Sequence, residues 1–154
     1  MVIMREIEIR EEDINSADAE KLIEELSSEL KNITCRDGKS SFNNDDMLND
    51  RAIFVVARDL NGKALGCGAL RYFSDEVAEI KRVYAREKSK GTGSKIIKFL
   101  EAKARELGYK KLILETGRIN KKAVNFYKKH NYQVITGYGK YVNMPESVCF
   151  TKFI

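Results

Sequence analysis

Residues 77–107, VAEIKRVYAREKSKGTGSKIIKFLEAKAREL, change their hydrophobic period halfway along. Val77–Tyr84 is typical of a strand. Further on, apolar residues recur at helical spacing (Ile96, Ile97, Leu100, Ala104 and Leu107), and Gly108 closes the helix. Leu112–Glu115 then forms a short strand. This strand, helix, strand order predicts a parallel strand pair within residues 77–115.

Upstream of this unit the chain predicts an antiparallel meander, with strands at 52–58 and 64–72 joined by a two-residue Asn61-Gly62 turn. Residues 4–10 alternate like an edge strand. Asn15 or Ser16 can cap a helix whose apolar face holds Leu22, Leu26, Leu30 and Ile33. Residues 45–49 also suit a short helix.

Downstream, Asn120 opens another helix that carries Val124 and Tyr127, and residues 132–135 and 148–153 are expected to be strands. The order of elements predicts an α/β (or α+β) domain around one mixed sheet. No repeat or linker interrupts the chain, so we expect a single domain over residues 1–154.

Composition excludes several classes of protein. Apolar residues make up 43% and charged residues 33% of the 154, which fits a globular domain. The longest apolar run, residues 52–57, is far below the roughly 20 residues that span a bilayer. The N-terminus has no signal-peptide core, and the three cysteines have no C-x-x-C spacing, so we expect a cytoplasmic protein with ordinary thiols. With one histidine and no clustered cysteines, we expect no metal site.

The net charge of +5 conceals a split along the chain. Residues 1–80 hold 10 Lys and Arg against 18 Asp and Glu, whereas residues 81–154 hold 18 against 5. Such asymmetry suggests an anionic partner, and the candidates are nucleic acid, anionic lipid and a phosphorylated cofactor.

The glycine-containing stretch K88-S-K-G-T-G-S94 lies between the predicted strand and helix. Glycines let backbone N–H groups approach a ligand, and a helix N-terminus adds unpaired donors and partial positive charge, so this stretch suits a phosphate. The same residues also suit a helix start that needs flexible backbone. The chain lacks a complete P-loop or dinucleotide fingerprint, although Glu115 stands about where a ribose-binding acid would, which keeps a dinucleotide site as a rival hypothesis.

Four motifs in sequence order resemble the GNAT superfamily of acyl-CoA-dependent N-acetyltransferases. They are A78-E-I-K-R-V-Y-A85, K88-S-K-G-T-G93, L112-I-L-E-T-G117 and N120-x-x-A123-x-x-F126-Y127-x-x-x-x-Y132. The resemblance implies a largely antiparallel mixed sheet flanked by helices, with a β-α-β core that binds acyl-CoA. Lys88 stands where the family usually has Arg or Gln, and the loop before Gly91 is a residue or two short.

The resemblance also implies the residues that bind acetyl-CoA. Its pyrophosphate is expected over Lys88–Ser94, with Lys88 and Ser89 beside backbone N–H groups of Lys90, Gly91, Thr92, Gly93 and Ser94. The pantetheine arm is expected to pair with the strand at Val83 and Ala85 and to meet Asn120, which is also a good helix N-cap. Tyr127 lies where the family often has a general acid, although its spacing also suits a core residue.

Acyl transfer from a thioester to an amine needs a base, donors for the oxyanion and a proton for the thiolate. We expect Tyr127 to give the proton to the thiolate and a backbone N–H near Val83 to donate to the oxyanion. Glu79 is the candidate base, directly or through a water; the alternative is a strand-face charge paired with Lys81 or Arg82. Glu115 is a second candidate base. A covalent route through Cys67 finds no support in the spacing of other residues.

The leading expectation is direct N-acetylation of a primary amine of a small molecule or peptide by acetyl-CoA. The alternatives are a catalytically silent acyl-CoA-binding domain that acts as a sensor or a partner, and a basic nucleic-acid-binding module. A homodimer stays open, and no membrane or nucleic-acid partner is expected. We expect the acceptor site in residues 31–50 and 136–146, and the acidic half of the chain suggests a cationic amine.

Overall fold

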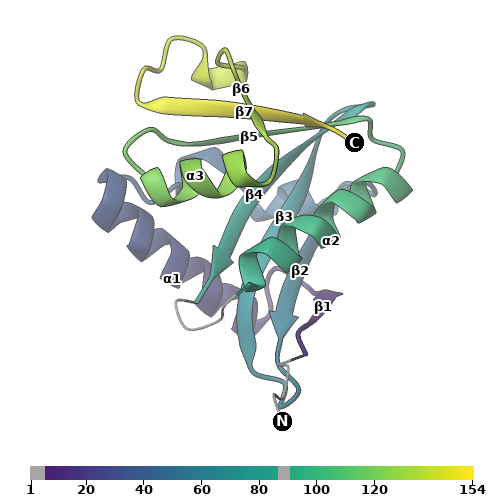
Figure 1. Ribbon diagram of the computed structural model, residues 1–154. Helices are drawn as coiled ribbons and strands as arrows, with labels where there is room; N and C mark the ends of the chain where they lie inside the picture. Colours follow the sequence, from purple (N-terminus) through teal and green to yellow (C-terminus); the bar gives the residue numbers. More distant parts are fainter. Residues whose placement is uncertain (1–5, 87–90) are drawn as a thin grey trace.

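The computed structural model describes residues 6–86 and 91–154, and its centre is one seven-stranded sheet (Figure 1). The strands are β1 (Glu8–Glu11), β2 (Ile53–Arg58), β3 (Ala64–Ser74), β4 (Val77–Ala85), β5 (Lys111–Gly117), β6 (Gln133–Ile135) and β7 (Ser147–Phe153). Their spatial order is β1-β2-β3-β4-β5-β7-β6. All neighbours are antiparallel except β4 and β5, so the expected mixed, largely antiparallel sheet with one parallel pair is confirmed.

In the described part of the chain, three α-helices flank the sheet: α1 (Ala17–Thr34), α2 (Thr92–Glu106) and α3 (Lys121–Lys129). Ser16 caps α1 by accepting a hydrogen bond from the Ala19 N–H, which settles the choice between Asn15 and Ser16. The short helix expected around residues 45–49 is present as a 3₁₀ helix at Asn44–Leu48, and a 3₁₀ turn at Lys39–Ser41 precedes it. None of the helices within the described ranges is long and apolar enough to cross a membrane.

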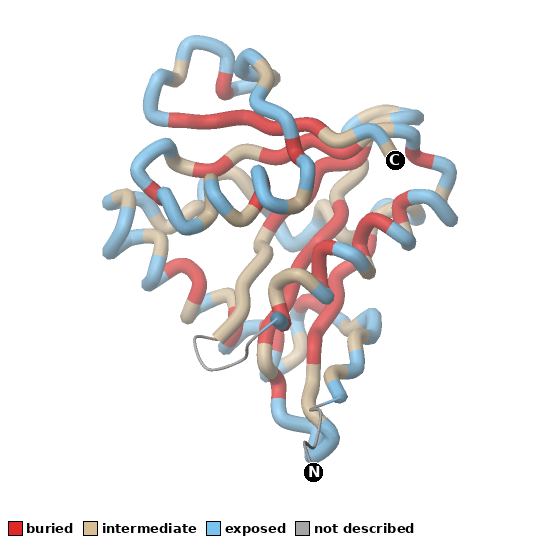
Figure 2. Tube along the Cα trace, in the orientation of Figure 1, coloured by how far each residue is buried: buried red, intermediate tan, exposed pale blue. Residues whose placement is uncertain are grey.

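The two faces of the sheet have separate apolar cores. Strand β2 is buried on both faces, because alternate side chains point to opposite sides. Val55 and Ala57 belong to the core beneath α2 and α3, whereas Phe54 and Val56 belong to the core beneath α1. Figure 2 shows the resulting buried stretch through the middle strands, with exposed residues concentrated on the helices and loops.

The connection between β2 and β3 is longer than the two-residue turn predicted at Asn61-Gly62. Strand pairing ends at Arg58 and Ala64, so residues 59–63 form the loop. The Asp59 carboxylate accepts hydrogen bonds from the N–H groups of Asn61 (2.9 Å) and Lys63 (3.0 Å). An aspartate that binds its own loop in this way stabilises a wider turn, and the dipeptide pattern does not reveal this.

Candidate active site

Strands β4 and β5 pair over three residues and then diverge. Val77–Glu79 lie beside Lys111–Ile113, and beyond this point β5 is paired with β7 alone. Figure 1 shows β4 turning away from β5 toward the N-terminal end of α2. A cavity of about 420 Å³ lies in the gap, lined by β4 from Ile80 to Ala85 and by the end of β5 from Glu115 to Gly117.

Elements from both faces of the sheet line this cavity. Asn120, Phe126 and Tyr127 contribute from α3, and Leu26 and Leu30 contribute from α1 on the other face. Leu30 and Ile33, which the helical pattern assigned to a core face, therefore leave the closed core and line the cavity instead. The gap in the sheet thus allows a ligand on the α3 side to meet a ligand on the α1 side.

A β-bulge interrupts β4 at the cavity. Cys67 pairs with Tyr84 and Ala69 pairs with Lys81, so one residue of β3 faces two residues of β4, Arg82 and Val83. Arg82 has a positive φ of 55°, which is uncommon for a residue with a side chain. The bulge places Arg82 on the same side of the sheet as Lys81: its guanidinium carbon lies 5.8 Å from the centre of the Phe42 ring, beneath α1.

The described part of the glycine loop begins at Gly91, since Lys88, Ser89 and Lys90 lie outside the described residues. Gly91 has φ +80°, a conformation that favours glycine, and it precedes the first turn of α2. N–H groups in a first turn have no acceptor within their own helix. Gly93 lines the cavity, and an added Cβ would lie 3.4 Å from the Phe126 ring. The hydroxyl of Thr92 is buried and has no hydrogen-bond partner in the described structure.

Asn120 and Tyr127 both line the cavity from α3, and both are buried. The side chain of Asn120 accepts a hydrogen bond from the Ala123 N–H (3.3 Å), so it caps α3 while bordering the cavity. Tyr127 packs edge to face on Phe126 and Tyr132. Burial raises the pKa of Tyr127 well above its usual value, so this phenol stays protonated at neutral pH and can donate a proton.

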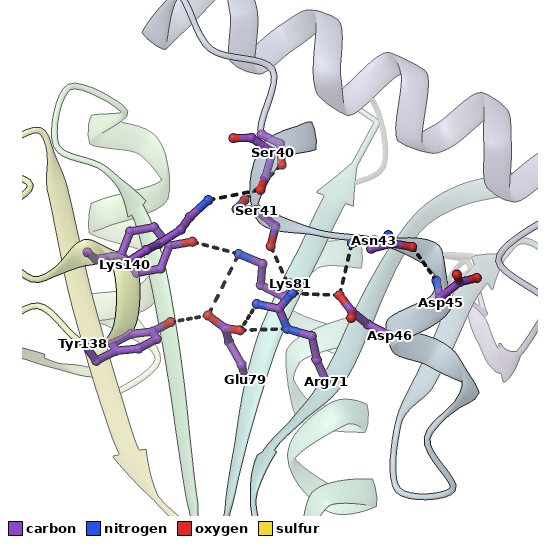
Figure 3. A network of polar contacts seen from close by, with 12 residues as sticks. Ser40, Ser41, Asn43, Asp45, Asp46, Arg71, Glu79, Lys81, Tyr138 and Lys140 are labelled. Carbon is purple, nitrogen blue, oxygen red and sulfur yellow. Dashed lines mark hydrogen bonds and ion pairs between the residues drawn. The ribbon is translucent and has the colours of Figure 1, made fainter.

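Glu79 is buried, 1% exposed, but it does not line the cavity. Its carboxylate accepts hydrogen bonds from Arg71 and from the Tyr138 hydroxyl, and the Lys81 ammonium lies 4.0 Å away. Figure 3 shows Arg71, Glu79 and Lys81 between the segment that carries Ser40–Asp46 and the loop that carries Tyr138 and Lys140. The surroundings of Glu79 are therefore polar, and Lys81, which the sequence suggests as one possible partner of this carboxylate, lies beside it.

Glu115 is the carboxylate of β5 that lines the cavity. Ser147 donates a hydrogen bond to it (2.5 Å), and the rest of its environment includes Lys81 and Tyr141. Lys81 donates a hydrogen bond to the Tyr141 hydroxyl (3.2 Å), and burial lowers the pKa of Lys81. Burial, assisted by the charge of Glu115, raises the pKa of Tyr141 to about 12. Tyr141 lines the cavity, whereas Tyr138 does not and instead donates a hydrogen bond to Glu79.

Cys67 and His130 both have structural partners. The Cys67 thiol donates to the Arg82 carbonyl (3.4 Å), and burial raises its pKa to about 12, which favours a packed thiol. His130 ends α3, and its Nε2 lies 2.9 Å from the Ser94 hydroxyl in the first turn of α2.

The charged residues that line the cavity were largely missed from the sequence. They are Glu29, Arg36, Lys81, Arg82, Glu115, Lys122 and Lys140, so cations outnumber carboxylates. The expectation that the acidic half presents negative charge to the acceptor is wrong for the described residues. Glu12, Asp18, Glu25 and Asp46 form ion pairs with arginines, and Glu29 alone of the carboxylates in residues 6–80 lines the cavity.

The chain matches the family model of the Acetyltransferase (GNAT) family over residues 19–132. It is 35% identical over 89 residues to an uncharacterized N-acetyltransferase of Schizosaccharomyces pombe, a match that covers 56% of this chain and 55% of the yeast protein. The chain thus spans about half the length of that relative.

Two solved structures have the same fold. One, described as an acyl-CoA N-acyltransferase, is from Klebsiella pneumoniae (TM-score 0.80, 28% identity, 96% of this chain and 97% of that one). The other is a GNAT family acetyltransferase from Elizabethkingia anophelis with acetyl-CoA bound (TM-score 0.69, 21% identity, 96% and 98%). The match to the family model over residues 19–132, which the diverging strands and the glycine turn before α2 support, establishes that the chain belongs to the GNAT family of acetyltransferases.

Proposed function

We propose that this protein is an N-acetyltransferase that moves an acetyl group from acetyl-CoA to a primary amine of a small molecule or peptide. The observation that carries the proposal is the cavity between β4 and β5, which residues from both faces of the sheet line. Such a cavity suits direct transfer in a ternary complex, with acetyl-CoA on the α2–α3 side and the acceptor on the α1 side.

Several features of the α2–α3 side fit acetyl-CoA. The first turn of α2 offers N–H groups to the pyrophosphate, after Gly91 in its left-handed conformation. Val83 and Ala85 line the cavity on the part of β4 that no longer pairs with β5, and their backbone would pair with the pantetheine arm there. Asn120 borders the same space. Lys88, Ser89 and Lys90 remain predicted contacts.

The proposed reaction forms a bond between the amine nitrogen and the thioester carbonyl carbon and then breaks the carbon–sulfur bond. A base takes the proton of the amine, the backbone N–H near Val83 stabilises the oxyanion, and Tyr127 protonates the departing thiolate. Glu79 remains a candidate base, but Arg71 and Tyr138 already occupy its oxygens. Glu115 borders the cavity itself, so we favour Glu115 as the base, directly or through a water.

Thermal unfolding with added nucleotides tests the cofactor. A ligand at about 100 times its Kd stabilises the folded state by about 2.7 kcal/mol, so saturating acetyl-CoA should raise Tm by several degrees while NAD and ATP do not. Release of free thiol is then measured across polyamines, amino acids, aminoglycosides, peptide N-termini and lysine peptides. Absence of a shift would refute the proposal. A shift without thiol release from any amine would instead identify a silent acyl-CoA-binding domain.

A further inference from the structure

Arg82 presents an unpaired cation to the cavity. Its Nε is buried and has no hydrogen-bond partner, and Nη1 makes one long contact, 3.4 Å, to the Asp37 carbonyl oxygen. Among residues 6–86 and 91–154, no carboxylate lies within ion-pair distance of this guanidinium. The charges of Asp37 and Glu24 act on it electrostatically over a longer distance. Four of the five guanidinium N–H donors lie on Nη1 and Nη2, and the long contact to Asp37 uses one of them, so the remaining donors can serve a ligand.

Lys81 stands next to it with a similar excess of donors. It is 8% exposed, and its ammonium donates to the Tyr141 hydroxyl while Glu79 lies at 4.0 Å. Glu79 offers it little, because Arg71 and Tyr138 hydrogen-bond to that carboxylate (Figure 3). An ammonium with three donors and one neutral partner therefore lines the cavity beside Arg82.

Burying cations costs free energy unless an anion or enough hydrogen bonds compensate. Arg71 is compensated in this way, because its guanidinium forms ion pairs with the carboxylates of Asp46 and Glu79. Among the described residues Arg82 has no such carboxylate, and Lys81 has only Glu79 at 4.0 Å, a carboxylate that Arg71 and Tyr138 already hydrogen-bond. Arg82 and Lys81 both line the same cavity. A bound anion would supply the missing partner.

We propose that the acceptor is an amine that carries a carboxylate close to its nitrogen, as an amino acid does, and that Arg82 and Lys81 bind this carboxylate. The inference rests on the proposed function and adds the substrate class. Arg82 immediately precedes Val83, where the reacting carbonyl is expected, so the anion would lie within a few bonds of the amine. The planar guanidinium can bind both carboxylate oxygens at once.

The position of Arg82 favours the acceptor over a phosphate of the cofactor. Its guanidinium contacts Phe42 and Asp37 on the α1 side, whereas the first turn of α2, which suits a phosphate, lies on the other face. Strand β4 ends at Ala85, three positions after Arg82, so about 10 Å of strand at 3.3 Å per residue lies between Arg82 and that end of β4.

Matched acceptor pairs test the proposal on the intact protein. Tyrosine and tyramine, and histidine and histamine, differ by the carboxylate, and phosphoethanolamine supplies a phosphate instead. We expect kcat/KM to be at least about tenfold higher for each carboxylated member, in line with hydrogen bonds to charged groups. In Arg82→Gln this ratio should fall by about tenfold while KM for acetyl-CoA changes little, and Arg82→Lys should restore part of it. Arg105→Gln, an exposed arginine on α2, is the matched control and should keep the wild-type ratio.

Three results would overturn the proposal: equal or faster acetylation of the decarboxylated amines, preference for phosphoethanolamine, or a rise in KM for acetyl-CoA in Arg82→Gln with an unchanged ratio. If no amine releases thiol, the proposed function fails separately, and calorimetry of N-acetyltyrosine with the protein saturated with CoA tests the anion site. Binding that Arg82→Gln weakens at least tenfold would support the site, and absence of binding to the wild type would refute it.

Discussion

Arg71 and Glu79 lie directly opposite each other on the antiparallel strands β3 and β4 and form a buried ion pair. The Arg71 Nε donates to Glu79 Oε1 at 2.9 Å, and its Nη1 donates to Asp46 and to the Ser41 carbonyl oxygen. One arginine therefore connects the sheet to the segment that carries Ser41, which lines the cavity.

We predict that Arg71→Met lowers the free energy of unfolding by about 3 kcal/mol, because it leaves the Glu79 carboxylate buried without its main partner. Urea unfolding measures this. Arg105→Met, at an exposed position, should change stability by less than about 0.5 kcal/mol. Arg71→Met combined with Glu79→Gln should lose less than the two single changes together, and simple additivity would mean that the pair is not coupled.

Tyr127→Phe should lower kcat by about 100-fold or more, since general acid catalysis contributes about 10²–10⁴. KM for acetyl-CoA should change by about twofold or less, because the ring and its packing remain. Steady-state thiol release measures both constants. Tyr109→Phe, which removes a hydroxyl bound to the Arg51 carbonyl far from the cavity, should leave kcat unchanged. Equal losses in kcat and acetyl-CoA affinity would make Tyr127 a packing residue.

Asn120 combines a helix cap with a predicted pantetheine contact, and two substitutions separate these roles. Asn120→Ala removes both and should cost about 1 kcal/mol of stability while raising KM for acetyl-CoA. Asn120→Ser keeps a good cap, so it should retain the stability yet still raise KM. Thermal unfolding and kinetics are measured on both variants. Normal kinetics in Asn120→Ser would restrict Asn120 to capping.

Glu115→Gln and Glu79→Gln distinguish the two candidate bases. Loss of a base should lower kcat/KM by about 100-fold or more and remove the acidic limb of its pH profile, and we expect this in Glu115→Gln. Glu79→Gln should mainly lower stability, because Arg71 and Lys81 lose their charged partner. The reverse assignment follows if the limb disappears in Glu79→Gln alone.

Stability should depend on His130 in mildly acidic solution. Burial lowers the pKa of His130 below 6.5, so the unfolded chain takes up the proton first as the pH falls. The contribution to stability is therefore complete above about pH 6.5 and is lost as the pH falls below it. We predict that Tm of the wild type falls more than Tm of His130→Gln between pH 7.5 and 5. Parallel curves would contradict the assignment.

The sequence by itself determined the order of the elements, the parallel pair within residues 77–115 and the Asn120 cap, and it left Asn15 and Ser16 as alternative caps of α1. Hydrophobic period, glycine placement and capping residues are local properties, so the residues that carry them are adjacent in the chain. The resemblance to the GNAT family, not a local pattern, implied that Gly93, Asn120 and Tyr127 lie along one ligand, and all three line the cavity.

Only the tertiary structure decided which charges reach the cavity. The bulge at Arg82 depends on pairing with β3. It places the Arg82 side chain on the same face of the sheet as Lys81, whereas a regular strand would place adjacent residues on opposite faces. Glu79 is hydrogen-bonded by Arg71, eight residues away in the chain, and by Tyr138, fifty-nine residues away. Glu115 borders the cavity because β4 and β5 diverge. Strand pairing and long-range ion pairs, which no local pattern encodes, therefore determine which charged groups border the cavity.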